Sequence, residues 1–316
     1  MAPGTAKLGT VKVWIAHAKG RELLGALPPG VRVEVCADAV TLPSDPTEVG
    51  FWVPPFGTAA FDLLPKLTGL RVVQLLSAGA DNWIGRVPPD VRLHDAAGVH
   101  DAAVAEWVLG AAIGSLRQFP AFARAQQRRE WAPAAFTPTA ELTGKRVLIV
   151  GAGSIGRAVE RRLAPFDVTV TRVARTARPE QDVHGVAELP DLLPRAEVVV
   201  LLVPLTDQTY GLVDGSFLAA LPDGALLVNA ARGPVVDTTA LLTEVASGRI
   251  GAALDVTDPE PLPAEHPLWE LPNVFITPHV GSAVVGLLPR AYRLVGEQLG
   301  RFAAGEPLVN RVVDGY

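Results

Sequence analysis

Short runs of consecutive hydrophobic residues, rich in valine, leucine and isoleucine, recur along the middle of the chain. Six of these runs are predicted strands: 146–150, 168–173, 198–203, 225–230, 252–256 and 274–278. Most of them are separated by patterns typical of helices: 154–164, 186–195, 215–221 and 238–247. Strands that are apolar throughout and alternate with helices are typical of a parallel sheet covered on both faces. The pattern therefore predicts a doubly wound α/β domain.

The first hundred residues repeat this alternation on a smaller scale, which predicts a second, smaller α/β unit. Its candidate strands are 12–16, 31–35, 49–53, 71–76 and 91–94, with helices near 20–26 and 57–67. Two further helices are predicted at 101–118 and 283–304. The first of these can start with Asp101 as its N-cap and is apolar on most of its surface, so it must be buried between domains or subunits.

Composition limits the class of protein. A chain of 316 residues suggests two domains, because single cores seldom grow beyond about 250–300 residues. The net charge of −5 gives no general attraction to nucleic acid or to anionic membranes. No apolar run approaches the ~20 residues that cross a bilayer, and the N-terminus lacks the hydrophobic region of a signal peptide. Cys36 is the single cysteine, which excludes an internal disulfide and a cysteine-based metal cluster. We expect a soluble, cytoplasmic protein with no metal site.

The stretch GAGSIG at 151–156 follows the first strand of the larger domain and opens a helix. In this context its glycines match the dinucleotide-binding fingerprint. Gly151 permits the tight turn, Gly153 lets the backbone approach a pyrophosphate, and Gly156 lets helix and strand pack closely. Free N–H groups at the start of the helix would face the phosphates. The sequence therefore predicts a Rossmann domain.

Three later segments place a polar residue just past the end of a strand. Arg232 follows the fourth strand, Asp255 and Glu260 follow the fifth, and His279 follows the sixth. The carboxyl ends of parallel strands lie at one edge of the sheet, where ligands bind. Arginine holds a carboxylate by paired hydrogen bonds, and histidine moves a proton to or from a carbonyl oxygen. A nearby glutamate favours and orients the protonated imidazole. Each residue alone also fits a surface or packing role, but together they favour an active site.

The order of these segments resembles the D-isomer-specific 2-hydroxyacid dehydrogenase family, in particular its glyoxylate and hydroxypyruvate reductases. The resemblance rests on GAGSIG, VPLTDQTYGLVD, NAARGPVVD, ALDVTDPEPLPAEHPLW and TPHVGS, together with LLSAGADNW and VHDAAVAEWVLG near the N-terminus. It covers nearly the whole chain. It implies reduction of a small 2-oxo acid to the D-2-hydroxy acid by hydride transfer from NADPH or NADH.

The resemblance also implies a division of labour. Residues 99–282 would form the cofactor domain, and residues 1–98 and 283–316 a flavodoxin-like substrate domain, with the active site in the cleft between them. Arg232 would bind the substrate carboxylate, and His279, paired with Glu260, would be the acid/base. Substrate contacts are expected at Ser77 and at the backbone N–H groups of Ala78 and Gly79. Cofactor contacts are expected at Ser154, Ile155, Val203, Pro204, Ala230, Asp255, His279 and Ser282. The family also implies a homodimer through the cofactor domain, with 101–118 as the candidate interface.

The cofactor preference depends on the stretch TRVARTARP at 171–179. In NAD-preferring relatives an acidic residue that binds the ribose stands 18 residues after the last glycine of the fingerprint, a position held here by Ala174 (156 + 18). Arg175 follows at once, with Thr176 and Arg178, and arginine suits a 2′-phosphate. We predict a preference for NADP(H), with NAD(H) also possible. The alternative is that the stretch is arginine-rich only because the chain is, with 23 arginines against 5 lysines.

Other functions stay open on the same fold. A dinucleotide-sensing binding protein, as in the related C-terminal-binding-protein corepressors, is one, and a phosphite dehydrogenase is another. Formate dehydrogenases fit poorly because they have glutamine where Glu260 stands.

The remaining histidines are expected to be structural or exposed: His17, His94, His184 and His266. His100 lies near the expected cleft, and Trp131 lies in a region that reaches a neighbouring active site in such dimers; their roles are left open.

Overall fold

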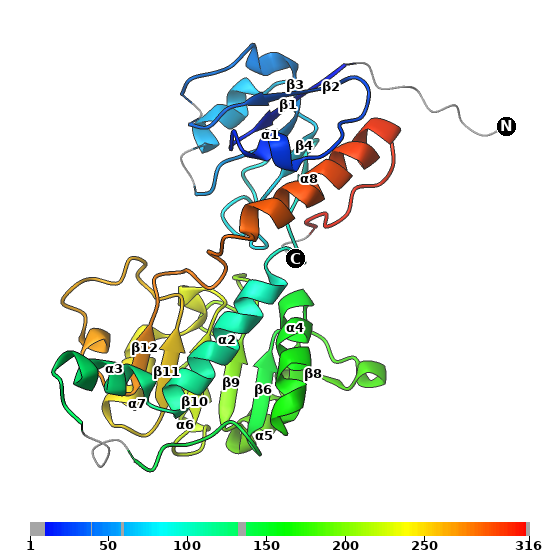
Figure 1. Cartoon of the computed structure of the whole chain (residues 1–316). Coiled ribbons are helices and arrows are strands. Elements are labelled where there is room, and N and C mark those ends of the chain that lie inside the picture. Colours follow the sequence, from blue (N-terminus) through cyan, green and yellow to red (C-terminus); the bar gives the residue numbers. More distant parts are fainter. Residues whose placement is uncertain (1–9, 39, 58–59, 132–136, 314–316) are drawn as a thin grey trace. The chain divides into compact units, whose positions relative to one another are not determined.

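The computed structural model describes residues 10–38, 40–57, 60–131 and 137–313. Contacts divide the chain into unit 1, residues 1–100 and 285–316, and unit 2, residues 101–284. Figure 1 shows both, with the C-terminal helix in unit 1. The sequence placed each boundary two residues earlier, after residues 98 and 282.

Unit 2 contains one parallel sheet in the order β12-β11-β10-β9-β6-β7-β8. Its strands are β6 (Arg146–Val150), β7 (Thr169–Ala174), β8 (Val183–Gly185), β9 (Val198–Leu201), β10 (Leu226–Asn229), β11 (Gly251–Leu254) and β12 (Val274–Ile276). Read from β8 to β11, this is the Rossmann order 3-2-1-4-5-6, and β12 extends it by one strand. The predicted doubly wound domain is therefore confirmed.

Alternate residues of these strands point to opposite faces of the sheet, as the period of two requires. On β6, Val147 and Ile149 pack with α2 (Asp101–Leu116) and α4 (Ser154–Leu163). Leu148 and Val150 pack on the other side, in a cluster with three further helices. These are α5 (Leu189–Leu192), α6 (Gly215–Ala219) and α7 (Thr238–Ala246). Because both faces are covered, the strands read as continuous hydrophobic runs.

The six strands predicted for this domain are present, with ends within two residues of the prediction, but the sheet has a seventh. The strand β8 reads VHG and has no hydrophobic run to mark it. The helix predicted at 101–118 ends at Leu116, because Gln118 takes the left-handed conformation with φ 57°. A separate helix, α3 (Phe119–Gln127), which the sequence pattern did not predict, follows.

Unit 1 contains a five-stranded parallel sheet in the flavodoxin-like order β2-β1-β3-β4-β5. The strands are β1 (Val11–Ile15), β2 (Val31–Val35), β3 (Val49–Val53), β4 (Val72–Gln74) and β5 (Arg92–His94), and the helix α1 is Gly20–Leu23. The helix expected at 57–67 is a 3-10 turn, Phe61–Lys66, that contains Pro65; residues 58–59 lie outside the described chain. Among the described residues, the other 3-10 turns are Pro46–Glu48, Ala164–Phe166, Pro179–Gln181, Val186–Glu188, Leu193–Arg195, Gly233–Val235 and Pro267–Trp269.

The C-terminal helix α8 (Leu287–Ala304) belongs to unit 1 through its core face and a buried amide pair. Tyr292, Val295 and Leu299 are fully buried in a cluster with β1 and β3. The side chain of Gln298 donates to Gln74 Oε1 at 2.8 Å and to the carbonyl of Val309 at 2.9 Å. Since buried amides are costly without partners, this pairing stabilises one position of the helix on the sheet.

None of the helices in the part of the chain that the structure describes combines the length and the hydrophobic stretch that a bilayer crossing requires.

Candidate active site

The glycine turn connects β6 to α4 and has the geometry that its sequence predicts. Gly151 has φ 122°, and a Cβ there would lie 2.6 Å from the backbone carbonyl group of Leu202. A Cβ on Gly156 would lie 2.1 Å from the carbonyl oxygen of Gly151, so only glycine permits this close approach. Gly153 caps α4 with no side-chain hydrogen bond and faces open space. The backbone at the start of α4 is thus accessible to an anionic group.

Ser154, the first residue of α4, has a partner that the sequence pattern did not reveal. Its hydroxyl donates a short hydrogen bond to the carboxylate of Asp101, the first residue of α2. The other oxygen of that carboxylate, Oδ1, is buried and has no hydrogen-bond partner among the described residues. Asp101, which the sequence pattern predicted as the N-cap, is thus the first helical residue of α2 and contacts the glycine turn directly.

The arginines predicted to bind a phosphate follow β7, whose last residue is Ala174. Arg175 and Thr176 are exposed. Arg178 folds back, and its Nη2 donates to the carbonyl oxygen of Ala152 in the glycine turn at 3.2 Å. Arg157, which the sequence reasoning missed, reaches the same oxygen at 3.5 Å; its position directly after Gly156 was the available signal.

The ends of β10, β11 and β12 are joined by backbone hydrogen bonds. The N–H of Asp255 donates to Asn229 at 2.9 Å, and the N–H of Thr277 donates to Leu254 at 2.9 Å. The N–H of His279 donates to the carbonyl of Asp255 at 2.7 Å. The residues predicted to act together therefore leave the sheet at adjacent positions on one edge.

Glu260 and His279 form the central ionisable pair. The Nδ1 of His279 lies 2.7 Å from Oε1 of Glu260, and the two side chains are 46% and 43% exposed. Because Glu260 takes Nδ1, the ring nitrogen left to exchange a proton with a bound molecule is Nε2. The pair is both oriented and open to solvent, which suits a proton donor and acceptor.

Arg232 lies at the next strand end and is half-buried. Its Nη1 donates to the carbonyl of Ala231 at 2.7 Å, and this hydrogen bond helps to fix the position of the guanidinium group. The turn before it is shaped by the buried Asn229, whose Oδ1 accepts from the N–H of Ala231 at 3.0 Å and whose Nδ2 donates to the carbonyl of Arg232 at 3.2 Å. Asn229 stands in the NAARG segment and was not predicted to matter.

Asp255 was expected to line the cofactor, and the structure gives its carboxylate another set of partners. The carboxylate is buried and accepts from the hydroxyl of Thr277 at 2.6 Å and from the N–H groups of Val280 and Gly281 at 2.8 Å each. By accepting these three hydrogen bonds, the carboxylate of Asp255 holds the loop that carries His279 in place.

The remaining cofactor positions surround this edge of the sheet. The N–H of Val203 would lie 3.0 Å from a Cβ on Gly151, so the segment after β9 touches the glycine turn. The others lie at the start of α4, after β9, after β10 and after the His279 loop: Ile155, Pro204, Ala230 and Ser282. All are half-buried except Pro204, which is exposed.

The expected substrate contacts of unit 1 form a tight loop after β4. Ser77 Oγ donates to the carbonyl of Gly79 at 2.7 Å, and the N–H of Ala96 donates to the carbonyl of Ser77 at 2.8 Å. Nε2 of the buried His100 lies 2.7 Å from the carbonyl of Leu76, so His100 contacts the residue that directly precedes this loop. The role of Ser77, Ala78 and Gly79 in substrate binding stays a prediction.

The other histidines make local contacts. His17 pairs with Tyr292 at 3.0 Å, His94 with the carbonyl of Val309 at 2.7 Å and His184 with Glu188 at 2.6 Å. Burial lowers the pKa of His17 and of His94. His266 accepts from the N–H of Leu268 at the start of a 3-10 turn. Trp131 is 97% exposed.

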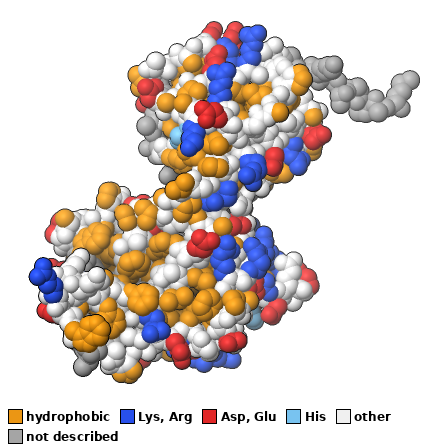
Figure 2. Space-filling model, viewed as in Figure 1, with side chains coloured by type: hydrophobic (Ala, Val, Ile, Leu, Met, Phe, Trp, Pro, Cys, Tyr) orange, Lys and Arg blue, Asp and Glu red, His pale blue; other side chains and the backbone are white. Residues whose placement is uncertain are grey.

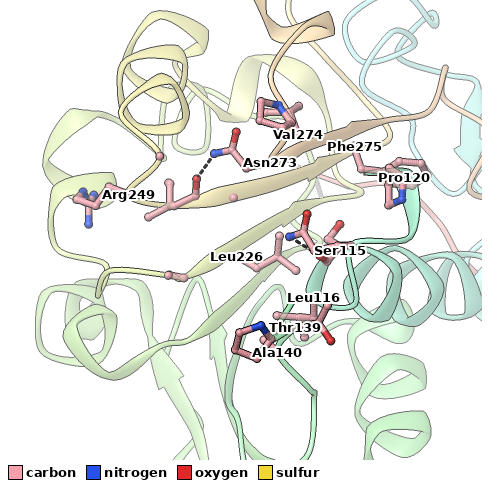
Figure 3. A pocket seen from close by; sticks show the side chains of 18 of the residues that line it. Ser115, Leu116, Pro120, Thr139, Ala140, Leu226, Arg249, Asn273, Val274 and Phe275 are labelled. Carbon is pink, nitrogen blue, oxygen red and sulfur yellow. Dashed lines mark hydrogen bonds between the residues drawn. The ribbon is translucent and has the colours of Figure 1, made fainter. Parts of the chain in front are cut away.

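A cavity of about 530 Å³ opens at the opposite edge of the unit 2 sheet, where β10, β11 and β12 begin (Figure 3). Two of its long polar side chains are already engaged. Arg249 donates to the carbonyls of Leu218 and Leu221 and contacts Glu244, and Asn273 donates to two carbonyls. Because its lining residues lie where these strands begin, the cavity is separate from the strand ends that carry Arg232 and His279.

A glycine turn at the start of a Rossmann sheet and a paired histidine at its carboxyl edge define a nicotinamide-dependent oxidoreductase. Residues 109–281 match the family described as D-isomer specific 2-hydroxyacid dehydrogenase, NAD binding domain. The chain belongs to this family, as its motifs indicated. Several of its homologues are named as dehydrogenases or reductases.

Three relatives illustrate the match. Glyoxylate reductase of Thermofilum pendens is 36% identical over 270 residues, which cover 80% of this chain and 78% of that one. The D-isomer specific 2-hydroxyacid dehydrogenase of Xanthobacter autotrophicus Py2, solved with NADPH and MES, has a TM-score of 0.84 at 32% identity, with 98% and 100% of the chains covered. An NADPH-dependent glyoxylate/hydroxypyruvate reductase of Sinorhizobium meliloti, solved with NADP and sulfate, has a TM-score of 0.83 at 28% identity, with 97% and 100% covered.

His279→Ala is expected to lower kcat for 2-oxo acid reduction by about 10²–10⁴-fold, the usual contribution of a positioned acid/base. His184→Ala is the matched control, since His184 and Glu188 form a pair of the same kind on β8. Steady-state kinetics on both variants is the measurement. Normal turnover in His279→Ala, or an equal loss in His184→Ala, would show that His279 is not the acid/base.

Proposed function

We propose that this protein reduces a small 2-oxo acid, of the glyoxylate or hydroxypyruvate kind, to the D-2-hydroxy acid, with NADPH preferred over NADH. The observation that carries the proposal is the hydrogen-bonded pair of His279 and Glu260, 2.7 Å apart, on the same strand edge as Arg232. Two of the relatives described above are named as reductases of these acids.

Each residue has a role that its chemistry supports. The guanidinium of Arg232 holds the substrate carboxylate, an arrangement that arginine favours through parallel hydrogen bonds. A bound nicotinamide supplies the hydride that reaches the carbonyl carbon. His279 gives a proton from Nε2 to the carbonyl oxygen and takes it back in the reverse direction. Glu260 stabilises the protonated imidazole and fixes the ring through Nδ1.

The residues at the glycine turn fit a dinucleotide. The turn leaves open space beside Gly153, and the start of α4 has no side-chain cap that would compete for its N–H groups. Ala174 leaves the end of β7 without a carboxylate, while Arg175 and Thr176 are exposed beyond it. We propose that Arg175 is the main contact of a 2′-phosphate, with support from Thr176 and Arg178. The relatives from Xanthobacter and Sinorhizobium were solved with NADPH and NADP.

Purified protein is expected to oxidise NADPH with glyoxylate or hydroxypyruvate and to form the D-isomer from hydroxypyruvate, as checked by chiral chromatography. The kcat/KM for NADPH should exceed that for NADH by about 10–100-fold, the worth of charge-assisted hydrogen bonds to a phosphate. Cofactor binding without turnover on a broad 2-oxo acid panel would instead support a dinucleotide-sensing protein. Reduction of NADP+ or NAD+ with phosphite, without turnover of any 2-oxo acid, would support a phosphite dehydrogenase.

Arg175→Ala is expected to lower kcat/KM for NADPH about tenfold and to leave that for NADH unchanged, because the lost charge faces only the 2′-phosphate. Arg161→Ala, an exposed arginine in the last turn of α4, is the control and should change neither value. Kinetics with both cofactors gives the comparison. Unchanged discrimination in Arg175→Ala would remove Arg175 from the proposal.

We also propose that the protein forms a homodimer through the face of unit 2 that carries α2 and α3. Hydrophobic side chains gather on this face (Figure 2). Phe119, at the start of α3, is 56% exposed, and Leu109 and Ile113 of α2 are only half-buried. Large exposed apolar patches are typical of interaction surfaces. The cytoplasmic location expected from the sequence stays a prediction.

Light scattering after size-exclusion chromatography is expected to give the mass of two chains. Phe119→Asp should shift the equilibrium toward the monomer, because it places a charge in the apolar interface. Val186→Asp changes an exposed apolar residue away from α2 and α3 and should leave the mass unchanged. A wild-type monomer, or a Phe119→Asp dimer as stable as wild type, would contradict this interface.

A further inference from the structure

Asp255, at the end of the neighbouring strand, accepts three hydrogen bonds from the backbone of the loop that carries His279. The N–H of His279 donates to the backbone carbonyl of Asp255, and the next two N–H groups, of Val280 and Gly281, donate to its carboxylate. His279 itself has φ 56°, a left-handed backbone conformation that residues other than glycine adopt at a cost in energy. These three hydrogen bonds keep the strained backbone in place.

The carboxylate of Asp255 has a further donor, the hydroxyl of Thr277, and this hydroxyl connects it to α2. Thr277 Oγ1 donates to Asp255 Oδ1 at 2.6 Å, and it accepts from the indole Nε1 of Trp107 at 3.0 Å. An indole N–H can only donate, and a hydroxyl has one proton. Trp107 therefore directs the hydroxyl proton of Thr277 onto Asp255.

Trp107 is held where it can do this. It is half-buried on α2 and packs against the cluster that joins α2 to the sheet. A Cβ on Gly281 would lie 3.4 Å from Cγ of the indole and 2.7 Å from Oδ2 of Asp255, so the ring also lies against the end of the loop. The indole is thus in contact with the chain on both sides of His279.

We propose that Trp107 is a positioning residue for His279. Its N–H orients the hydroxyl of Thr277, the hydroxyl completes the set of donors on the buried carboxylate of Asp255, and that carboxylate fixes the backbone from 279 to 281. Trp107 has no proton to exchange with a substrate and acts only through this chain of hydrogen bonds. The inference rests on the proposed function for its kinetic readout, but the loop geometry can be tested without it.

Trp107→Phe keeps an aromatic ring and removes the N–H. Its kcat is expected to fall about 3–10-fold, the loss of one net hydrogen bond converted to rate, while the KM values for cofactor and 2-oxo acid change little. The effect falls on kcat because His279 acts in the transition state. Trp14→Phe is the matched control: its indole donates to Glu34 at 2.9 Å in unit 1, so it should lose thermal stability and keep its kinetic constants.

A double-mutant cycle separates positioning from packing. Thr277→Val is expected to lower kcat at least as much as Trp107→Phe, and Thr277→Ser, which keeps the hydroxyl, should retain most of the activity. In the Thr277→Val background, Trp107→Phe should have no further effect on kcat, because the hydrogen bond that it removes is already absent. Multiplicative losses in the double variant would mean that Trp107 does not act through Thr277, and would overturn the proposal.

Amide hydrogen exchange on the cofactor-free protein gives a readout independent of activity. Trp107→Phe should speed exchange of the amides of 279, 280 and 281, and Trp14→Phe should not. If the wild type fails to reduce any 2-oxo acid, the proposed function fails while the exchange experiment still decides the role of Trp107. If the wild type is active and Trp107→Phe matches it in kcat and in exchange, the positioning role alone is wrong.

Discussion

A carboxyl group is costly to bury unless hydrogen-bond donors surround it, and Asp255 meets this condition with a hydroxyl and two backbone N–H groups. All three donors come from one loop, so the electrostatic need of the carboxylate is also what shapes the backbone around His279. Removing one of these donors would leave a buried carboxylate oxygen with fewer hydrogen bonds, which is costly. The position of His279 beside Glu260 therefore depends in part on this cluster.

Parallel strands make such a cluster possible. Because β10, β11 and β12 run side by side in the same direction, residues that follow them meet although they are distant in the sequence. The sheet places Arg232, Glu260 and His279 along one edge, and the glycine turn leaves the same edge after β6. Arg232, the pair of His279 and Glu260, and the glycine turn thus share one edge of the unit 2 sheet.

The sequence predicted what has a local pattern. Continuous hydrophobic runs located the major strands, and the glycine spacing located the turn, because burial and close approach leave their mark within a few residues. The strand β8 and the helix α3 have no such mark. Nor could the pattern reveal Asn229, Arg157 or Trp107: Trp107 and Thr277 are 170 positions apart, and only the fold brings their hydrogen-bonding atoms together. Asp255 was identified by type and place, but the donors on its carboxylate were not.

The helix α2 contacts the glycine turn and the His279 loop at two positions that are close in its sequence. Asp101 accepts from Ser154, and Trp107, six residues later, donates to Thr277. At ~1.5 Å per residue these contacts are about 9 Å apart along the helix axis, and each residue turns the helix by about 100°. An inserted or deleted residue between them would rotate one side chain away from its partner while the other stayed in place. This segment can therefore vary in the composition of its outer face, but its length is fixed by the two hydrogen bonds at its ends.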